Sequence, residues 1–214
     1  MTRLTILYCH GFASSAHGVK AGFLRRQMAD RPEVDFRAVE FNPTPRDFEY
    51  LTVTGLVNRL RQYVVDHHPS DLRLIGSSLG ALVALNYAHR FGGVDRLLLL
   101  APALAYRRHL LLSAGELARW ETEGVLYVEH YGFETTLPLR FDFHRDALQY
   151  TTSPPPPASV RILHGRGDEV IPIDESRRYA AAYPDRVALV ELDADHGLTG
   201  CLEALWENVQ EFLL

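Results

Sequence analysis

The sequence of 214 residues has few cysteines, almost no lysine and no long apolar run. Its two cysteines, Cys9 and Cys201, lie far apart and outside any C-x-x-C pattern, which argues against a disulfide framework or a zinc site. No segment reaches the eighteen or so consecutive apolar residues that a membrane-spanning helix needs. Lys20 is the sole lysine. The bias toward arginine fits genome composition as well as it fits stability, so the sequence alone assigns Lys20 no function.

The charge pattern also lacks a basic block. The net charge of -5 comes from interleaved acids and bases, so nothing predicts contact with the phosphates of a nucleic acid. The first ten residues show no secretion pattern, and we expect a cytoplasmic protein without a membrane span. Hydrophobic residues make up 47% of the chain, which is typical of one globular domain over residues 1–214. The oligomeric state does not follow from the sequence.

Apolar runs and amphipathic segments alternate along the chain. Short, fully apolar runs predict strands buried on both faces of a parallel sheet. The expected strands are 4–8, 34–41, 72–76, 94–100, 160–163 and 187–192, and the expected helices are 19–28, 51–65, 79–91, 174–183 and 202–213. This alternation predicts an α/β fold with a doubly wound, mostly parallel sheet of about six strands.

The alternation breaks over residues 102–157. This stretch holds an expected helix at 114–123, an aromatic-rich segment at 127–143, a short helix near 146–150 and four consecutive prolines at 154–157. It is too long for a plain connection, so we interpret it as a cap-like insertion over the active-site edge of the sheet. The alternative is a peripheral decoration that contacts no ligand.

The motif Gly76-x-Ser78-x-Gly80 joins an apolar strand to an apolar, alanine-rich helix. In that context it predicts a sharp turn that exposes the Ser78 hydroxyl, with Gly76 and Gly80 giving room for close backbone approach. An ordinary strand-to-helix turn with packing glycines explains the motif equally well when it is taken alone. The other loops of the same sheet edge therefore decide between the two.

Three further loops carry polar residues directly after strands: His10-Gly11-Phe12, Gly165-Arg166-Gly167-Asp168 and Asp195-His196-Gly197. In a parallel sheet all of these positions converge at one edge. A serine nucleophile needs a base, and His196 is the candidate. The imidazole needs a carboxylate on its other nitrogen, for which Asp168 is preferred over Asp193 and Asp195 because those two stand too near His196 in sequence.

An oxyanion formed on the substrate needs preorganised N–H donors. The N–H of Leu79, at the start of the helix after Ser78, is the first expected donor. The second is expected from the loop after the first strand, most simply Phe12, with Ala13 as the alternative. His10 and Gly11 are expected to support that loop, His10 through a hydrogen bond.

These motifs together resemble the α/β-hydrolase superfamily, and more narrowly its small bacterial esterase-like members. The resemblance implies Ser78 as nucleophile, His196 as base, Asp168 as acid, and Phe12 and Leu79 as oxyanion donors. It implies a serine hydrolase that cleaves a small-molecule ester or thioester through an acyl-enzyme, without a cofactor. A peptidase or amidase with the same triad, and a ligand-binding protein on the same scaffold, are the alternatives.

The substrate pocket is the least determined part of the site. Tyr106, Trp120 and Phe143 are candidates to line an apolar acyl pocket, and Arg166 is a candidate contact for an anionic substrate. The aromatic residues fit equally well as the core of the insertion itself. The histidines of residues 102–157 lack the spacing of metal ligands, so no metal site is expected.

Overall fold

The computed structural model describes residues 3–106 and 112–214. Six strands form one sheet in which every neighbouring pair is parallel, in the order β2-β1-β3-β4-β7-β8. The predicted doubly wound sheet is confirmed. The strands are β1 (Leu4–Cys9), β2 (Val34–Val39), β3 (Asp71–Ser77), β4 (Arg96–Leu100), β7 (Ser159–Gly165) and β8 (Val187–Leu192).

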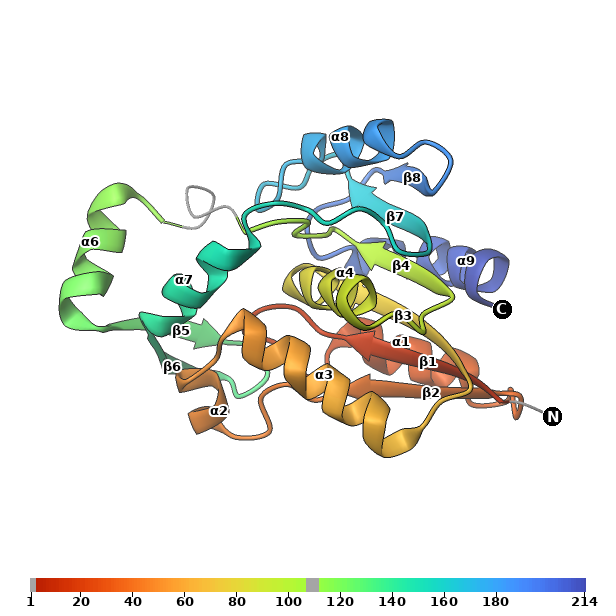
Figure 1. Cartoon of the computed structure of the whole chain (residues 1–214), viewed down its shortest axis with the longest axis horizontal. Helices are drawn as coiled ribbons and strands as arrows, with labels where there is room; N and C mark the ends of the chain where they lie inside the picture. The colour runs from red at the N-terminus through yellow and green to blue at the C-terminus, as the bar shows by residue number, and fades with distance from the viewer. Residues whose placement is uncertain (1–2, 107–111) are drawn as a thin grey trace.

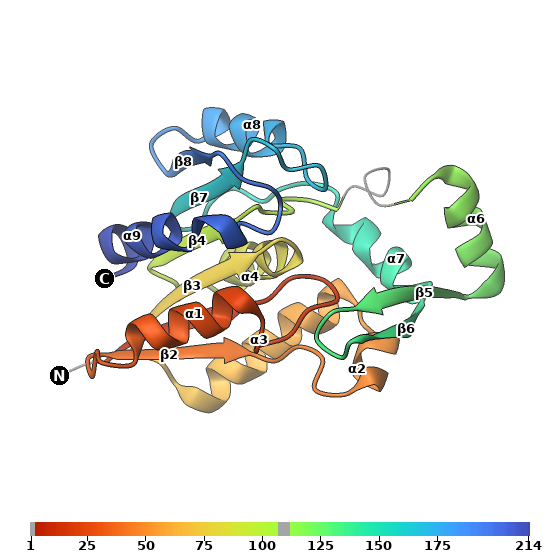
Figure 2. The ribbon, with the colours of Figure 1, turned by 180° about the vertical axis from the view of Figure 1, so that it is seen from behind.

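Helices cover both faces of this sheet (Figures 1 and 2). Helices α1 (Val19–Met28) and α9 (Leu202–Leu213) pack on one face, and α3 (Val53–His67), α4 (Leu79–Phe91) and α8 (Asp174–Ala182) pack on the other. Helix α4 is buried along most of its length, from Leu79 to Ala88, because it packs on the centre of the sheet. An amphipathic surface helix would keep a polar face instead.

Two helix boundaries show how local chemistry places the elements. Helix α3 begins two residues later than predicted because Thr52 caps it, accepting the N–H of Gly55 at 2.9 Å. The short helix α2 (Pro45–Glu49) was not predicted. Thr44 and Asp47 form a capping box there, and Pro45 occupies a first-turn position where its missing N–H costs nothing.

The segment between β4 and β7 contains α6 (Ala114–Glu123), β5 (Val125–His130), β6 (Thr135–Arg140), α7 (Asp142–Ala147) and a 3₁₀ turn, η1 (Leu148–Tyr150). Strands β5 and β6 form an antiparallel hairpin that begins two residues before the segment 127–143, which was predicted only as aromatic-rich. The hairpin buries Leu137 and Leu139 and exposes Tyr127 and Tyr131.

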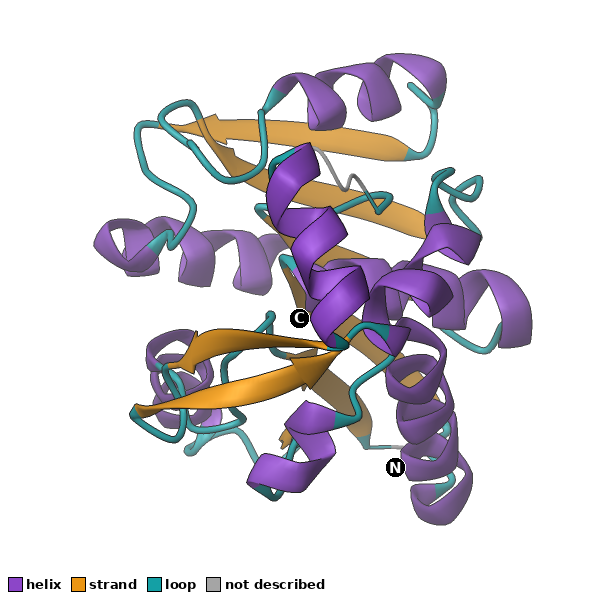
Figure 3. Ribbon diagram, turned by 90° about the vertical axis from the view of Figure 1, so that its left-hand side faces the viewer, coloured by secondary structure: helices purple, strands orange, loops and turns teal. Residues whose placement is uncertain are grey.

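This segment lies beyond the carboxyl ends of the parallel strands, toward which the arrows point in Figures 1 and 2. Seen from that side, the hairpin and α6 stand in front of the sheet (Figure 3). The hairpin tip is tied to the loop after β1, because the N–H of Tyr131 donates to the carbonyl of Ala13 at 2.9 Å. Among the described residues, no helix is long and apolar enough to cross a membrane.

Candidate active site

The parallel register brings the four predicted loops to one level. Cys9 pairs with Gly76, Gly76 with Leu99, and Leu99 with Ile162 across the centre of the sheet. The chain leaves each strand within a few residues of these pairs. The side chains that follow β1, β3, β7 and β8 therefore meet at the carboxyl edge.

Ser78 stands at the turn between β3 and α4 with φ 52° and ψ -118°. A non-glycine residue with positive φ is strained, and such strain concentrates at functional sites. Ala13, Ala101 and Leu198, in the loops after β1, β4 and β8, also have positive φ. Four strained residues thus lie in loops at the same edge of the sheet.

The glycines of the elbow are required by backbone contact. A Cβ on Gly80 would overlap the carbonyl groups of Cys9 and His10, and one on Gly76 would lie 2.5 Å from the Cα of Ala81. A Cβ on Gly11 would be less crowded, 3.3 Å from the carbonyl oxygen of Ser77. Gly76 and Gly80 therefore allow α4 to start against β1 and β3 and hold Ser78 in its turn.

The three predicted triad residues lie in hydrogen-bond contact. The Oγ of Ser78 is 3.0 Å from Nε2 of His196, and Nδ1 of His196 is 2.7 Å from Oδ2 of Asp168. Asp193 and Asp195 do not take the place of Asp168. In this arrangement the Ser78 hydroxyl donates to His196, and the imidazole donates to the carboxylate, which is the tautomer a general base requires.

The Asp168 carboxylate is fully buried and accepts several hydrogen bonds. Its Oδ1 accepts the N–H groups of Val170 and Ile171 at 2.9 and 2.8 Å, and Nε2 of His164 lies 3.1 Å from Oδ2. Burial raises the pKa of Asp168, but the hydrogen bonds from His164, His196 and Ile171 outweigh it and hold the pKa well below its ordinary value. The carboxylate is therefore ionised at neutral pH.

His164 lies near the end of β7, directly before the loop that carries Asp168, and the sequence-based prediction gave it no role. Its Nε2 faces two acceptors, Asp168 and the carbonyl of Ile171, so Nε2 carries the proton. Its Nδ1 then accepts from the Ser176 hydroxyl at 2.8 Å, and both side chains are fully buried. This network holds Oδ2 of the Asp168 carboxylate, whereas the two backbone N–H groups hold Oδ1.

The loop after β1 is held by Glu40, which the sequence did not single out. Nε2 of His10 lies 3.1 Å from Oε1 of Glu40, and the N–H groups of Ala16 and Asn42 donate to the same carboxylate at 2.9 Å. Burial raises the pKa of Glu40, but these hydrogen bonds outweigh burial and lower the pKa to about 2. His10 thus makes the loop-supporting hydrogen bond that was expected of it.

Two cavities meet at Ser78 and His196. The smaller, of about 300 Å³, is apolar. Tyr106 and Phe143 line it, together with Phe12, Leu82 and Tyr131. The larger, of about 740 Å³, is a more polar cleft that includes Ser14, Ser15, His17, Lys20 and Thr199. Tyr131 at the hairpin tip lines both cavities, and Phe12 does so from the loop after β1.

Two candidates for the substrate pocket lie elsewhere. Trp120 packs edge-on against Phe141 and donates to the carbonyl of Leu139 at 3.0 Å, inside the core of the insertion. Arg166 is exposed and pairs with Glu191. Neither lines either cavity at Ser78, so the expected pocket roles of Trp120 and Arg166 are wrong.

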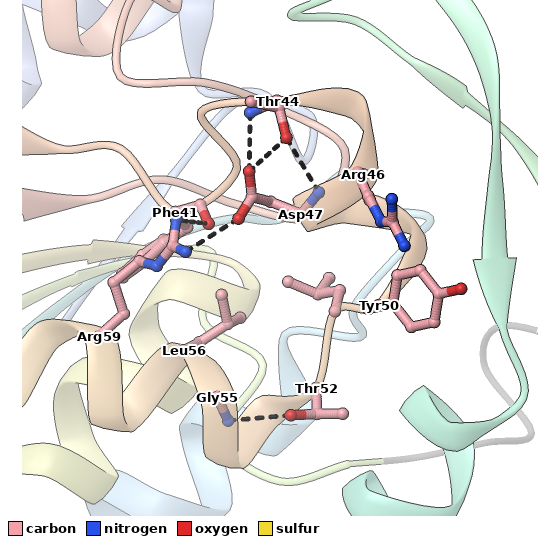
Figure 4. Close-up of a pocket in the computed structure, with 10 residues that line it drawn as sticks. Phe41, Thr44, Arg46, Asp47, Tyr50, Thr52, Gly55, Leu56 and Arg59 are labelled. Carbon is pink, nitrogen blue, oxygen red and sulfur yellow. Dashed lines mark hydrogen bonds and ion pairs between the residues drawn. The ribbon is translucent and has the colours of Figure 1, made fainter.

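A third hollow, of about 360 Å³, lies between α2 and α3 (Figure 4). Its polar groups serve the fold: Thr44 and Asp47 cap α2, and Thr52 caps α3. Arg59 donates to Asp47 and to the carbonyl of Phe41. Its lining residues include no serine, cysteine or histidine, and its two threonine hydroxyls cap helices, so this hollow is not the candidate active site.

One known protein family matches almost all of the chain. The model of one family, described as an uncharacterised protein family, matches residues 5–213. The chain belongs to UPF0227. Solved structures then show which fold this UPF0227 chain has.

The UPF0227 chain resembles solved α/β-hydrolase structures over 98% of its length. A candidate hydrolase from Agrobacterium vitis S4 superposes with a TM-score of 0.81 at 18% identity, over 87% of that chain. The mouse alpha/beta hydrolase domain-containing protein 10 gives 0.76 at 21% identity over 89%, and Est1E from Butyrivibrio proteoclasticus with bound ferulic acid gives 0.76 at 19% over 88%. At these identities the likeness establishes the α/β-hydrolase fold of this UPF0227 chain and no substrate.

Proposed function

We propose that this chain is a serine hydrolase that cleaves a carboxylic ester or thioester through an acyl-enzyme. The observation that carries the proposal is the contact series from Ser78 Oγ to His196 at 3.0 Å and from His196 to Asp168 at 2.7 Å. It starts at a strained, half-buried residue at a strand-to-helix turn, and this residue lines both cavities. A serine placed in this way is a nucleophile with its base in position.

In the proposed reaction, Ser78 Oγ attacks the carbonyl carbon of the substrate while Nε2 of His196 takes the hydroxyl proton. His196 then gives that proton to the leaving oxygen or sulfur as the bond to the acyl carbon breaks. Water attacks the acyl-enzyme with the same base and releases the acid. Asp168 stays ionised and stabilises the imidazolium in both steps.

Two backbone N–H groups are proposed to bind the oxyanion. Leu79 is the first residue of α4, so its N–H has no acceptor within the helix and lies at the positive end of the helix dipole. Phe12 lies in the loop that Glu40 and His10 hold against the sheet, and it lines both cavities at Ser78. Removing one such donor typically costs about 3 to 4 kcal/mol in the transition state.

The apolar cavity is proposed to hold the acyl group, and the insertion is proposed to act as its cap. A volume of about 300 Å³ corresponds to about ten water-sized groups, which fits a short or medium acyl chain or one aromatic ring. Similarity to Est1E, which binds ferulic acid, and to carboxylesterases of Nitrososphaera gargenis supports an ester substrate.

Hydrolysis of p-nitrophenyl esters of increasing chain length tests the proposal. We expect turnover that Ser78→Ala lowers on the order of 10⁴-fold or more, with the buried neighbour Ser77→Ala as the matched control. A panel of matched thioesters and anilides separates thioesterase and amidase activity from esterase activity. Binding of these compounds with no turnover of any of them would instead indicate a ligand-binding protein and would refute the proposal.

A further inference from the structure

The polar cleft differs from the apolar cavity in the groups that it offers a ligand. Hydroxyl groups of Ser14, Ser15 and Thr199 line it, and Lys20 is the one lysine of the chain. Its volume of about 740 Å³ is more than twice that of the apolar cavity. The two halves of a substrate therefore meet different chemistry on the two sides of Ser78.

The leaving group belongs on the side of His196, provided that the proposed function holds. The leaving atom has to lie within hydrogen-bond reach of Nε2 of His196, which protonates it. His196 lines both cavities, but Gly197 and Thr199, which follow it in the chain, line the polar cleft and are not among the lining residues of the apolar cavity. The apolar cavity is lined by Leu79, Leu82 and Phe143 and is left for the acyl group.

Lys20 lines this cleft, and so does Gly197, the residue that its ammonium group contacts. Nζ donates to the carbonyl of Gly197 at 2.6 Å, a contact between α1 and the loop that carries His196. An ammonium has three donors, and among the described residues Gly197 is the one hydrogen-bond acceptor that Lys20 reaches. Two donors thus remain for a ligand.

The surroundings leave the charge of Lys20 incompletely balanced. Burial lowers the pKa of Lys20, and the nearby Asp195 opposes this shift. Asp195 makes no ion pair with Lys20 within the described structure, and its Oδ1 accepts the N–H of Leu198. The first turn of α1 contains no acid and no side-chain cap, so the positive end of the helix dipole adds to the same field. Glu134, which also lines the cleft, carries a negative charge that opposes this positive field.

We propose that Lys20 binds an anionic group on the leaving group of the substrate, so that the enzyme prefers esters or thioesters whose leaving group carries a carboxylate or a phosphate. A partly buried ammonium is stabilised by an anion that it can pair with. Arginine supplies nearly all the other positive charge of this chain. At position 20 the compact ammonium of a lysine is suited to donate one hydrogen bond to Gly197 and to turn its other donors toward the cleft.

The test compares three esters with the same butyryl group: phenyl butyrate, 3-carboxyphenyl butyrate and 3-phosphonooxyphenyl butyrate. We expect the wild-type kcat/KM to favour one or both anionic esters by on the order of tenfold to a hundredfold over phenyl butyrate, as for a hydrogen-bonded charge pair. The better anionic ester tells a carboxylate site from a phosphate site. Added salt lowers the preference because it screens the pair.

Lys20→Gln separates anion binding from support of the His196 loop. Its amide retains a donor for the Gly197 carbonyl but carries no charge, so we expect the preference to disappear while turnover of phenyl butyrate persists. Lys20→Arg is expected to retain part of the preference. Arg26→Gln, an exposed cation on the same helix, is the control and leaves the preference unchanged.

Three results would overturn the inference about Lys20: no preference in the wild type, a preference that survives in folded Lys20→Gln, or an equal loss for neutral and anionic esters. The third would assign Lys20 a positioning role only. The proposed function fails separately, if no ester or thioester is cleaved in a Ser78-dependent manner. Thermal unfolding shows whether each variant is folded.

Discussion

Replacing Asp168 by asparagine tests the electrostatics of the site. Oδ1 of Asp168 accepts two backbone N–H groups, from Val170 and Ile171, so the oxygen of an asparagine has to occupy that position. The amide NH₂ then takes the place of Oδ2 and faces Nδ1 of His196 and Nε2 of His164. The variant thus exchanges an acceptor for a donor at the point where both histidines donate.

The consequence for His196 is a change of tautomer. With a donor opposite Nδ1, the imidazole carries its proton on Nε2 and cannot accept the proton of Ser78. The corresponding substitution in a serine protease triad lowers kcat about 10⁴-fold, which is about 5.4 kcal/mol at 1.36 kcal/mol per tenfold. We expect a loss of this size in kcat for Asp168→Asn, with a smaller change in KM.

The assay is steady-state hydrolysis of a p-nitrophenyl ester together with thermal unfolding of each variant. Asp193→Asn is the matched control, because Asp193 is an exposed acid in the loop that precedes His196. We expect its activity to stay close to that of the wild type. If folded Asp168→Asn kept kcat within tenfold of the wild type, the role assigned to the Asp168 carboxylate would be wrong.

Three further predictions concern the elbow, the loop after β1 and the acyl cavity. Gly80→Ala forces a methyl group onto the carbonyls of Cys9 and His10, so we expect urea unfolding to show destabilisation of about 1 to 3 kcal/mol or more. An unchanged urea midpoint would contradict the packing described for the turn at Ser78. Glu40→Gln removes a carboxylate whose pKa is lowered to about 2, so the carboxylate stabilises the fold above its ordinary pKa of about 4.5 and loses this effect as the pH falls toward 2. The difference in unfolding free energy between the wild type and Glu40→Gln should therefore shrink over that pH range, and a constant difference would refute the role given to the Glu40 carboxylate. Phe143→Ala enlarges the apolar cavity and should move the preferred p-nitrophenyl ester to a longer acyl chain, whereas an unchanged chain-length profile would place the acyl group elsewhere.

The elbow and its partner loops could be predicted from the sequence because parallel strands bring post-strand residues together regardless of their separation in the chain. Ser78, Asp168 and His196 each follow an apolar run, so their convergence follows from the fold class. The competing acids Asp193 and Asp195 could be set aside from sequence position, and the geometry agrees with that choice.

Residues whose contacts depend on tertiary packing were harder to predict. Trp120 looks like a pocket aromatic in sequence, but it packs within the insertion, where its N–H finds the Leu139 carbonyl. His164 and Glu40 have no pattern that marks them, since their roles depend on the loops that close around them. The alternating buried residues Leu137 and Leu139 are a strand signal that could have revealed the β5–β6 hairpin, but the aromatic residues around them obscured that signal.

Ser78 is proposed to be a nucleophile that His196 activates. The most direct measurement is labelling with a fluorophosphonate, followed by identification of the modified residue by mass spectrometry. We expect one label on Ser78, which is absent from Ser78→Ala, strongly reduced in His196→Ala and retained in Ser77→Ala. Absence of labelling in the folded wild type, or a label on Ser77, would contradict it.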